Sequence, residues 1–206
     1  MIEYLNHTPV ASFIFVFTIV TSIYAFNDNS LYGKFMLNPY NVSRKHKVFT
    51  LITSGFIHAD WMHLIFNMVT FFSFGFALES MIGSLNFGIL YFVSLIASDL
   101  PTVFKHKNDI WYNSLGASGA ISAVLFSFIL FSPFSSLYIM PIPFAIWSIV
   151  FGPLYLVYCI YAAKQARDNI NHDAHFFGAL SGVILTILLV PGVIPGFLAE
   201  IMAKIG

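Results

Sequence analysis

The sequence is poor in charge. Only 9% of its 206 residues are charged, nine basic and nine acidic, so the formal net charge is zero. A soluble domain carries about 25% charged residues, and a nucleic-acid-binding domain needs a basic surface. The scarcity of charge therefore excludes an ordinary soluble enzyme, a disordered chain and a nucleic-acid-binding protein.

Cysteine is almost absent. The single cysteine, Cys159, has no partner for an internal disulfide, and it lies in an apolar run. We expect it to be a small residue of the core.

Hydrophobic residues make up 58% of the chain, or about 119 residues. A helix that crosses a bilayer needs about 20 apolar residues, so this number suffices for about six such helices. The composition predicts an all-α, polytopic membrane protein in which residues 1–206 form a single domain of six transmembrane helices.

The gaps between charged residues place these spans. The charge-free stretch between Asp109 and Lys164 is too long for one helix, and Ser132 and Pro133 mark a turn inside it. The polar connection 27–57 is expected to be an interfacial loop with short helices, and 196–205 a short surface helix. The predicted spans are 9–26, 61–78, 84–104, 116–131, 142–162 and 174–190.

Three polar groups stand at the starts of the second, fourth and sixth spans. They are His58 to His63 with Asn67, Gly116 to Ala120, and His172 to Gly178. Polar groups inside a membrane are costly and therefore mark functional sites. Because each crossing reverses the chain, these three helices run in one direction, and their starts share one side of the membrane. We expect a single site there.

Ser118 and His175 are the candidates for chemistry. A serine is a poor nucleophile until a base takes its proton, and His175 is the natural base. Ser118 opens a helix between Gly116 and Gly119, where the N–H groups and the helix dipole favour an oxyanion. The pattern predicts a Ser–His dyad.

Other residues are expected to support the dyad. His63 and Asn67 lie four apart on one helical face and can both donate hydrogen bonds to an oxyanion. Gly178 and Gly182 form a small-residue ridge that lets the sixth helix approach the fourth closely. Asp173 points about 200° away from His175, so it cannot complete a triad within this helix.

Several polar residues have ordinary interpretations. We expect His58, Asp60 and Trp61 to lie at the membrane interface and His172 to be a solvated helix cap. Glu79, with Gly83, is expected to mark the end of the second helix.

These motifs resemble those of the rhomboid family of intramembrane serine proteases, in its six-span form, over nearly the whole chain. The segment from His58 through His63 to Asn67 resembles the family's H-x4-H-x3-N motif. Gly116-Ala117-Ser118-Gly119 resembles the G-x-S-G motif, His175 to Gly178 the H-x-x-G motif, and Glu79 with Gly83 the Glu-x3-Gly pattern.

The resemblance implies hydrolysis of peptide bonds in transmembrane protein substrates. Ser118 would attack, His175 would move the proton, and His63, Asn67 and the Ser118 N–H would hold the oxyanion. No metal or other cofactor and no nucleic acid is implied. We expect a multi-pass protein in the lipid bilayer of a bacterial inner membrane.

Two positions depart from the family pattern. Phe49 and Thr50 stand where many members carry Trp-Arg, so the loop is expected to be anchored through Arg44 or Lys47. Ser122 stands where some members have a tyrosine that stacks on the catalytic histidine.

Two other classes compete with the protease interpretation. In a membrane metalloprotein, four histidines would together bind zinc or haem iron: His58, His63, His172 and His175. The sequence has no H-E-x-x-H pair, and metal binding would leave the glycine-flanked Ser118 unexplained. The third class is a non-catalytic, rhomboid-like membrane chaperone or a transporter with a polar interior.

Overall fold

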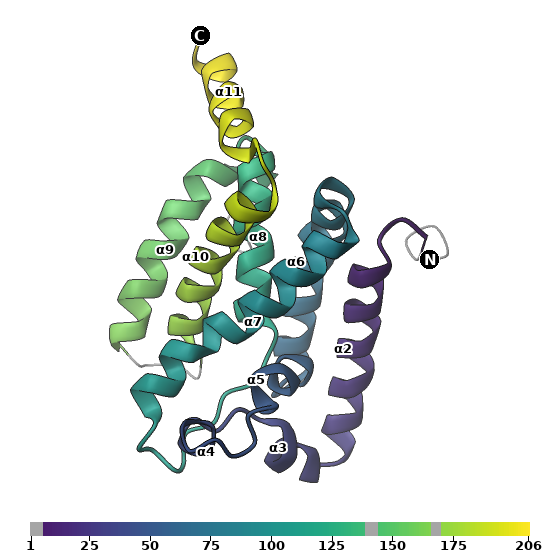
Figure 1. Cartoon of the computed structure of the whole chain (residues 1–206), viewed down its shortest axis with the longest axis vertical. Helices are drawn as coiled ribbons and strands as arrows, with labels where there is room; N and C mark the ends of the chain where they lie inside the picture. Colours follow the sequence, from purple (N-terminus) through teal and green to yellow (C-terminus); the bar gives the residue numbers. More distant parts are fainter. Residues whose placement is uncertain (1–5, 139–143, 166–169) are drawn as a thin grey trace.

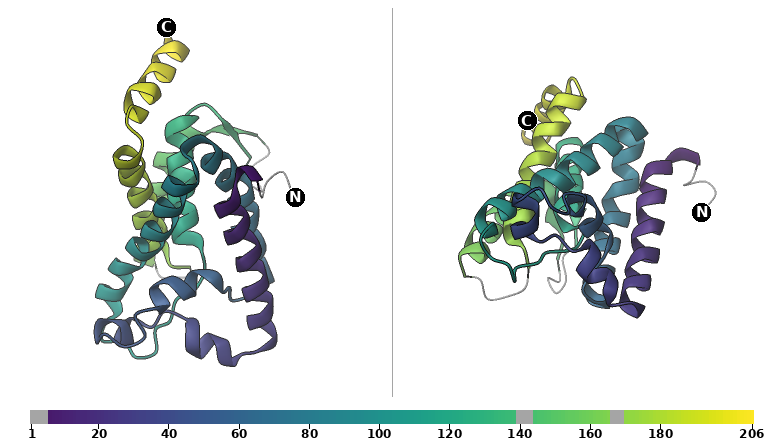
Figure 2. Two further views of the ribbon diagram at one scale, coloured as in Figure 1. Left: turned by 45° about the vertical axis from the view of Figure 1, so that its right-hand side comes forward. Right: turned by 60° about the horizontal axis from the view of Figure 1, so that its bottom comes forward.

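The computed structural model describes residues 6–138, 144–165 and 170–206. In this part of the chain, helices form a bundle and the only strands are two short ones (Figures 1 and 2). The all-α prediction is confirmed. The bundle helices are α2 (Pro9–Asn27), α6 (Trp61–Ile82), α7 (Ser84–His106), α8 (Ser118–Phe131), α9 (Ser148–Gln165) and α10 (His172–Leu189).

The predicted start of the fifth span is wrong. α9 begins at Ser148 rather than at 142, and 142–143 lie outside the described residues. Strand β2 (Ile146–Trp147) pairs antiparallel with β1 (Ser136–Leu137) before the helix begins. The Ser148 N–H donates to the Ser135 carbonyl over 2.9 Å, which ties the start of α9 to the connection that follows α8.

Four of the described helices, α2, α6, α7 and α10, are long and apolar enough to cross a membrane. α8 is apolar but has only 14 residues, or about 21 Å of helix. It nevertheless lies in the interior of the bundle, packed against α10, α7 and α6. Because a hydrocarbon core is about 30 Å thick, a helix this short begins or ends below the membrane surface.

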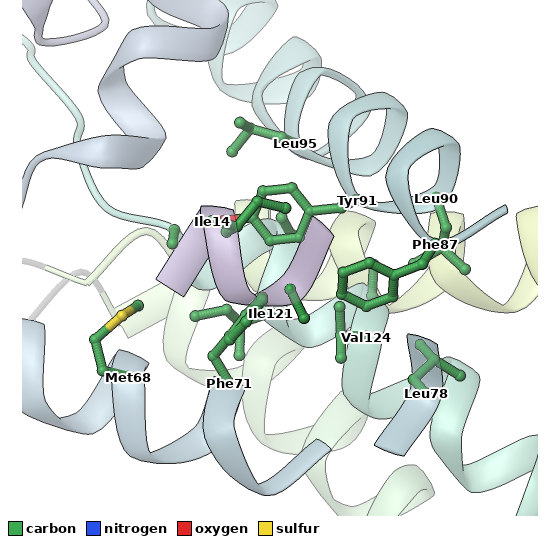
Figure 3. Close-up of a cluster of buried hydrophobic side chains, with 14 of the residues drawn as sticks. Ile14, Met68, Phe71, Leu78, Phe87, Leu90, Tyr91, Leu95, Ile121 and Val124 are labelled. Atoms are coloured by element: carbon green, nitrogen blue, oxygen red, sulfur yellow. The ribbon is translucent and has the colours of Figure 1, made fainter. Parts of the chain in front are cut away.

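An apolar cluster holds α8 in the middle of the bundle (Figure 3). Ile14 of α2, Phe71 of α6 and Tyr91 of α7 are fully buried, and they belong to one apolar cluster with Val124 of α8. The rings of Phe71 and Tyr91 meet edge to face, with centroids 5.8 Å apart. Helices in a membrane associate largely through such close packing.

Short helices form the polar connection, as predicted. They are α3 (Ser30–Phe35), α4 (Pro39–Ser43), α5 (Thr50–Thr53) and the 3-10 helix η1 (Ser54–Phe56). Arg44 donates to the Lys107 carbonyl over 2.8 Å, and Lys47 donates to the Gly33 carbonyl over 2.8 Å. The expected anchoring through Arg44 or Lys47 is confirmed for both. The predicted C-terminal helix is α11 (Val193–Ile205), which begins three residues earlier than expected.

Glu79 fastens α2 to α6. Its buried carboxylate accepts hydrogen bonds from the N–H groups of Val10 (3.1 Å) and Ala11 (2.5 Å). The first N–H groups of a helix lack intrahelical partners, so the carboxylate satisfies the start of α2. Gly83 ends α6 with a φ of +79°, a conformation that favours glycine. The structural interpretation of both residues is confirmed.

Candidate active site

The three polar groups meet at one end of the bundle. α6, α8 and α10 all begin at the end where α3, α4 and α5 lie (Figure 1). Ser118 is the first residue of α8, His63 the third of α6 and His175 the fourth of α10. The structure therefore brings the starts of these helices together, as the direction of the chain predicted.

α8 and α10 are in backbone contact beside Ser118. A Cβ added at Gly178 would overlap the Gly119 carbonyl, and one added at Gly182 would overlap the backbone of Ala123. Gly119 follows Ser118, and Gly178 lies one turn after His175. The small-residue ridge therefore holds the turn that carries His175 against the start of α8. The side chains of Ser118 and His175 are both partly exposed.

His63 covers the loop that precedes Ser118. A Cβ at Gly116 would lie only 2.6 Å from the His63 ring, and Gly116 has a φ of +113°. Both constraints favour glycine here. Asn67 is buried and donates one amide hydrogen to the His63 carbonyl over 2.9 Å, which fixes its side chain beside that turn of α6.

His58, which was expected to be an ordinary structural residue at the membrane interface, is fully buried inside the protein. Its Nε2 accepts from the Ala117 N–H at 3.5 Å, and its Nδ1 lies 3.0 Å from the Ser22 hydroxyl on α2. Because Nε2 accepts, Nδ1 carries the proton and donates to Ser22. The pKa of His58 is lowered to about 3, chiefly by burial and also by His63, while Asp60 acts in the opposite direction. A neutral imidazole thus connects α2 to the residue before Ser118.

Backbone hydrogen bonds hold the rest of this loop. Leu37 and Ser114 exchange two hydrogen bonds of 2.9 Å, and the Gly116 N–H donates to the Ser54 carbonyl over 2.9 Å. The loop before Ser118 is therefore fixed by the interfacial connection as well as by α2.

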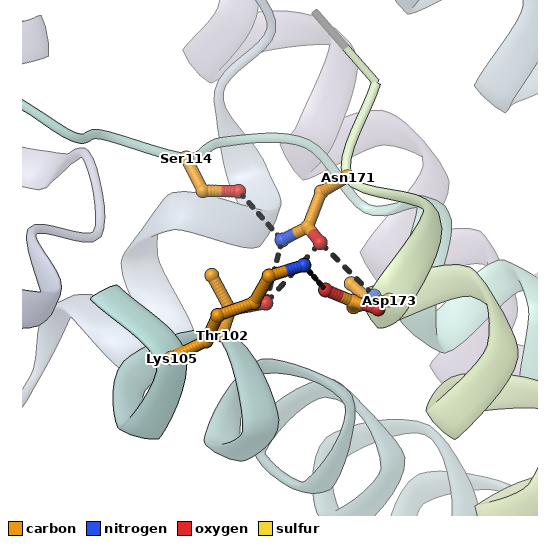
Figure 4. A network of polar contacts seen from close by, with 6 residues as sticks. Thr102, Lys105, Ser114, Asn171 and Asp173 are labelled. Carbon is orange, nitrogen blue, oxygen red and sulfur yellow. Dashed lines mark hydrogen bonds and ion pairs between the residues drawn. The ribbon is translucent and has the colours of Figure 1, made fainter. Parts of the chain in front are cut away.

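Asn171 positions the start of α10 (Figure 4). Its side chain caps the helix by accepting from the Ala174 N–H over 3.0 Å. Its amide nitrogen donates to the hydroxyls of Thr102 (3.0 Å) on α7 and Ser114 (3.2 Å) in the loop. Sequence reasoning missed Asn171, although asparagine before a helix is a common N-cap signal.

Asp173 forms an ion pair with Lys105 at the end of α7, with a 2.5 Å separation (Figure 4). Its carboxylate is therefore turned toward α7. This agrees with the prediction that Asp173 is not the acid of a triad.

Tyr155 of α9 is a second residue that sequence reasoning missed. Its ring stacks on His175, with centroids 6.3 Å apart and planes inclined by 14°. Its hydroxyl lies 3.1 Å from the Ser122 hydroxyl. The ring that is missing at position 122 is thus supplied by a different helix, and its position inside an apolar run carried no signal of this role.

The four-histidine metal set of the competing interpretation is not assembled. Among the described residues, the one group of three or more histidine, cysteine or acidic side chains placed to hold a metal is Cys159, His172 and His175. His172 is 4% exposed, so its prediction as a solvated cap is wrong. The α9 helix covers it, and the Tyr158 ring meets it edge to face at 5.5 Å.

Comparisons with known proteins agree with one another. The profile of the Rhomboid domain matches residues 45–192. Rhomboid protein 1, mitochondrial, of Saccharomyces cerevisiae is 32% identical over 140 residues, which cover 66% of this chain and 40% of that protein. Putative rhomboid protease YdcA of Bacillus subtilis is 32% identical over 150 residues, which cover 68% of this chain and 66% of that protein. The chain thus spans 40% of the length of the yeast protein and 66% of the length of the Bacillus subtilis protein.

Proposed function

Because the chain belongs to the rhomboid family, we propose that it is an intramembrane serine endopeptidase that cleaves transmembrane protein substrates. Ser118 is the nucleophile and His175 the base. The observation that carries this proposal is the backbone contact between Gly119 and Gly178, which seats the turn of His175 beside Ser118.

The reaction begins when His175 takes the proton of the Ser118 hydroxyl. The oxygen attacks the carbonyl carbon of the scissile peptide bond, and the carbonyl oxygen becomes negative. Ser118 lies in the first turn of α8, where N–H groups have no helical partner, so its N–H donates to this oxyanion. His63 and Asn67 donate from the facing helix.

Collapse of this intermediate breaks the C–N bond, and His175 returns the proton to the leaving amine. A water molecule, deprotonated by His175, then hydrolyses the acyl-enzyme and restores the Ser118 hydroxyl. No fixed negative charge takes part, since Asp173 is paired with Lys105.

Substrate helices reach the site through the side of the bundle. α9 forms an outer edge in Figure 1 and carries Gly152 and Pro153. We assign α9 as the element that moves to admit a substrate.

The cellular site of this activity is proposed to be a bacterial inner membrane, which the similarity to the Bacillus subtilis protein supports. Relatives named as mitochondrial favour an organelle instead. Membrane fractionation of the source cells distinguishes the two.

A serine-reactive phosphonate probe tests the dyad. We expect it to label the purified protein, and we expect Ser118→Ala and His175→Ala to abolish both labelling and cleavage of a transmembrane reporter. Ser73→Ala and His46→Ala are matched controls, because both side chains are exposed and lie outside the site. Absence of labelling in folded wild-type protein would exclude the dyad and favour a non-catalytic role.

A further inference from the structure

A cluster of three metal-binding side chains includes His175 and two residues that the mechanism described above does not use. Cys159 of α9, His172 and His175 place one ligand atom each within 4.8 Å of the others. Cys159 is fully buried and His172 nearly so. The proposed mechanism uses only one of the three.

The geometry fits a small tetrahedral ion. His172 and His175 are three apart on α10, so they share one helical face, and their ring centroids are 5.8 Å apart. Zinc binds nitrogen at about 2.0 Å and sulfur at about 2.3 Å, which puts the two nitrogens of a tetrahedral site roughly 3.3 Å apart and each nitrogen roughly 3.5 Å from the sulfur. The ligand atoms, which lie within 4.8 Å of one another, therefore need to approach by at most about 1.5 Å.

The chemistry of the donors also favours zinc. One thiolate and two imidazoles are the ligands that zinc prefers, and three protein ligands leave a fourth position for water. Tyr158 packs against His172, and Tyr155 stacks on His175. These rings restrict the orientation of both imidazoles before any ion binds.

We propose that Cys159, His172 and His175 form an inhibitory Zn²⁺ site. The bound ion takes the lone pair of the His175 imidazole, so this ring cannot accept the proton of Ser118. Binding displaces the thiol proton of Cys159 to solvent. The inhibition rests on the proposed protease function, whereas the metal site itself does not.

Metal binding is measured directly on the full chain, purified metal-free in detergent. We expect one equivalent of Zn²⁺ by elemental analysis and, with Co²⁺, a thiolate-to-metal charge-transfer band. Since Cys159 is the only cysteine of the sequence, this band reports that residue alone. His172→Gln should weaken binding by at least about tenfold. The control His46→Gln, at an exposed site, should not.

Inhibition is measured by cleavage of a transmembrane reporter. Zn²⁺ should inhibit the wild type, and a chelator should restore cleavage. Cys159→Ser, Cys159→Ala and His172→Gln should keep the basal rate and resist Zn²⁺ at concentrations at least about ten times higher.

The outcomes separate the two proposals. A missing cobalt–thiolate band, or unchanged affinity in His172→Gln, overturns the metal site. Stoichiometric binding without inhibition, or equal inhibition of the variants, overturns its inhibitory role. If the wild type cleaves nothing, the protease function fails, while the binding measurements still decide the metal site.

Discussion

The contact between α8 and α10 leads to a quantitative prediction for Gly178→Ala. The added methyl group would overlap the Gly119 carbonyl, which is backbone and cannot rotate away. Restoring an ordinary carbon–oxygen contact requires the two helices to separate by about 1 Å. A misplacement of this size costs about 10²-fold in rate, or about 2.7 kcal/mol in the barrier.

The stability of this variant should change much less than its activity. Overpacking costs about 1–3 kcal/mol, but replacing glycine by alanine inside a helix returns about 1 kcal/mol. We therefore expect a melting temperature within a few degrees of the wild type, together with about 100-fold slower cleavage of a transmembrane reporter in detergent.

Gly88→Ala is the matched control. Gly88 lies inside α7, and the nearest atom to an added Cβ would be Val10 Cγ1 at 3.7 Å, an ordinary contact. It should cleave at the wild-type rate. Near-wild-type cleavage by Gly178→Ala would refute the argument that this contact positions His175.

Three further predictions concern residues around the site. Tyr155→Phe should stay within about threefold of the wild-type cleavage rate, whereas Tyr155→Ala should lose up to about tenfold, because stacking contributes about 0.5–1.5 kcal/mol; equal rates for the two variants would contradict this. Glu79→Ala leaves two N–H groups of α2 without their acceptor and should lower the free energy of unfolding by about 1–3 kcal/mol. The melting temperature should fall, while the cleavage rate of the folded protein stays unchanged. Because the pKa of His58 is lowered to about 3 in the folded protein, its neutral state stabilises the fold fully above pH 6.5. As the pH falls from 6.5 toward 3, this stabilisation decreases by about 1.4 kcal/mol per pH unit. Melting temperatures across this range should fall less steeply in His58→Gln.

The helices were predictable because a bilayer excludes charge. The gaps between charged residues placed five of the six bundle helices within about four residues of their observed ends, and the direction of the chain then placed Ser118, His63 and His175 at one end. These inferences need only local sequence and the thickness of a membrane. The start of α9 was not predictable in this way, since β2 is apolar and uncharged as a helix would be.

Contacts between distant segments were not predictable from the sequence. The burial of His58 depends on Ser22, 36 residues earlier, and on the Ala117 N–H, 59 residues later. The stacking of Tyr155 on His175 depends on how α9 packs against α10. No spacing in the sequence marks these contacts, because the packing angle between two helices is set by their whole interface.

Glu79 has a consequence for how freely the sequence of α2 can change during evolution. Its carboxylate recognises the N–H groups of Val10 and Ala11, which belong to the backbone and are present in almost any sequence. At the other end of α2, the Ser22 hydroxyl supplies the contact to His58. Much of the remaining surface of α2, including Phe13, Val20 and Tyr24, is exposed. Substitutions there can adapt the helix to a different lipid while both attachments to the bundle are kept.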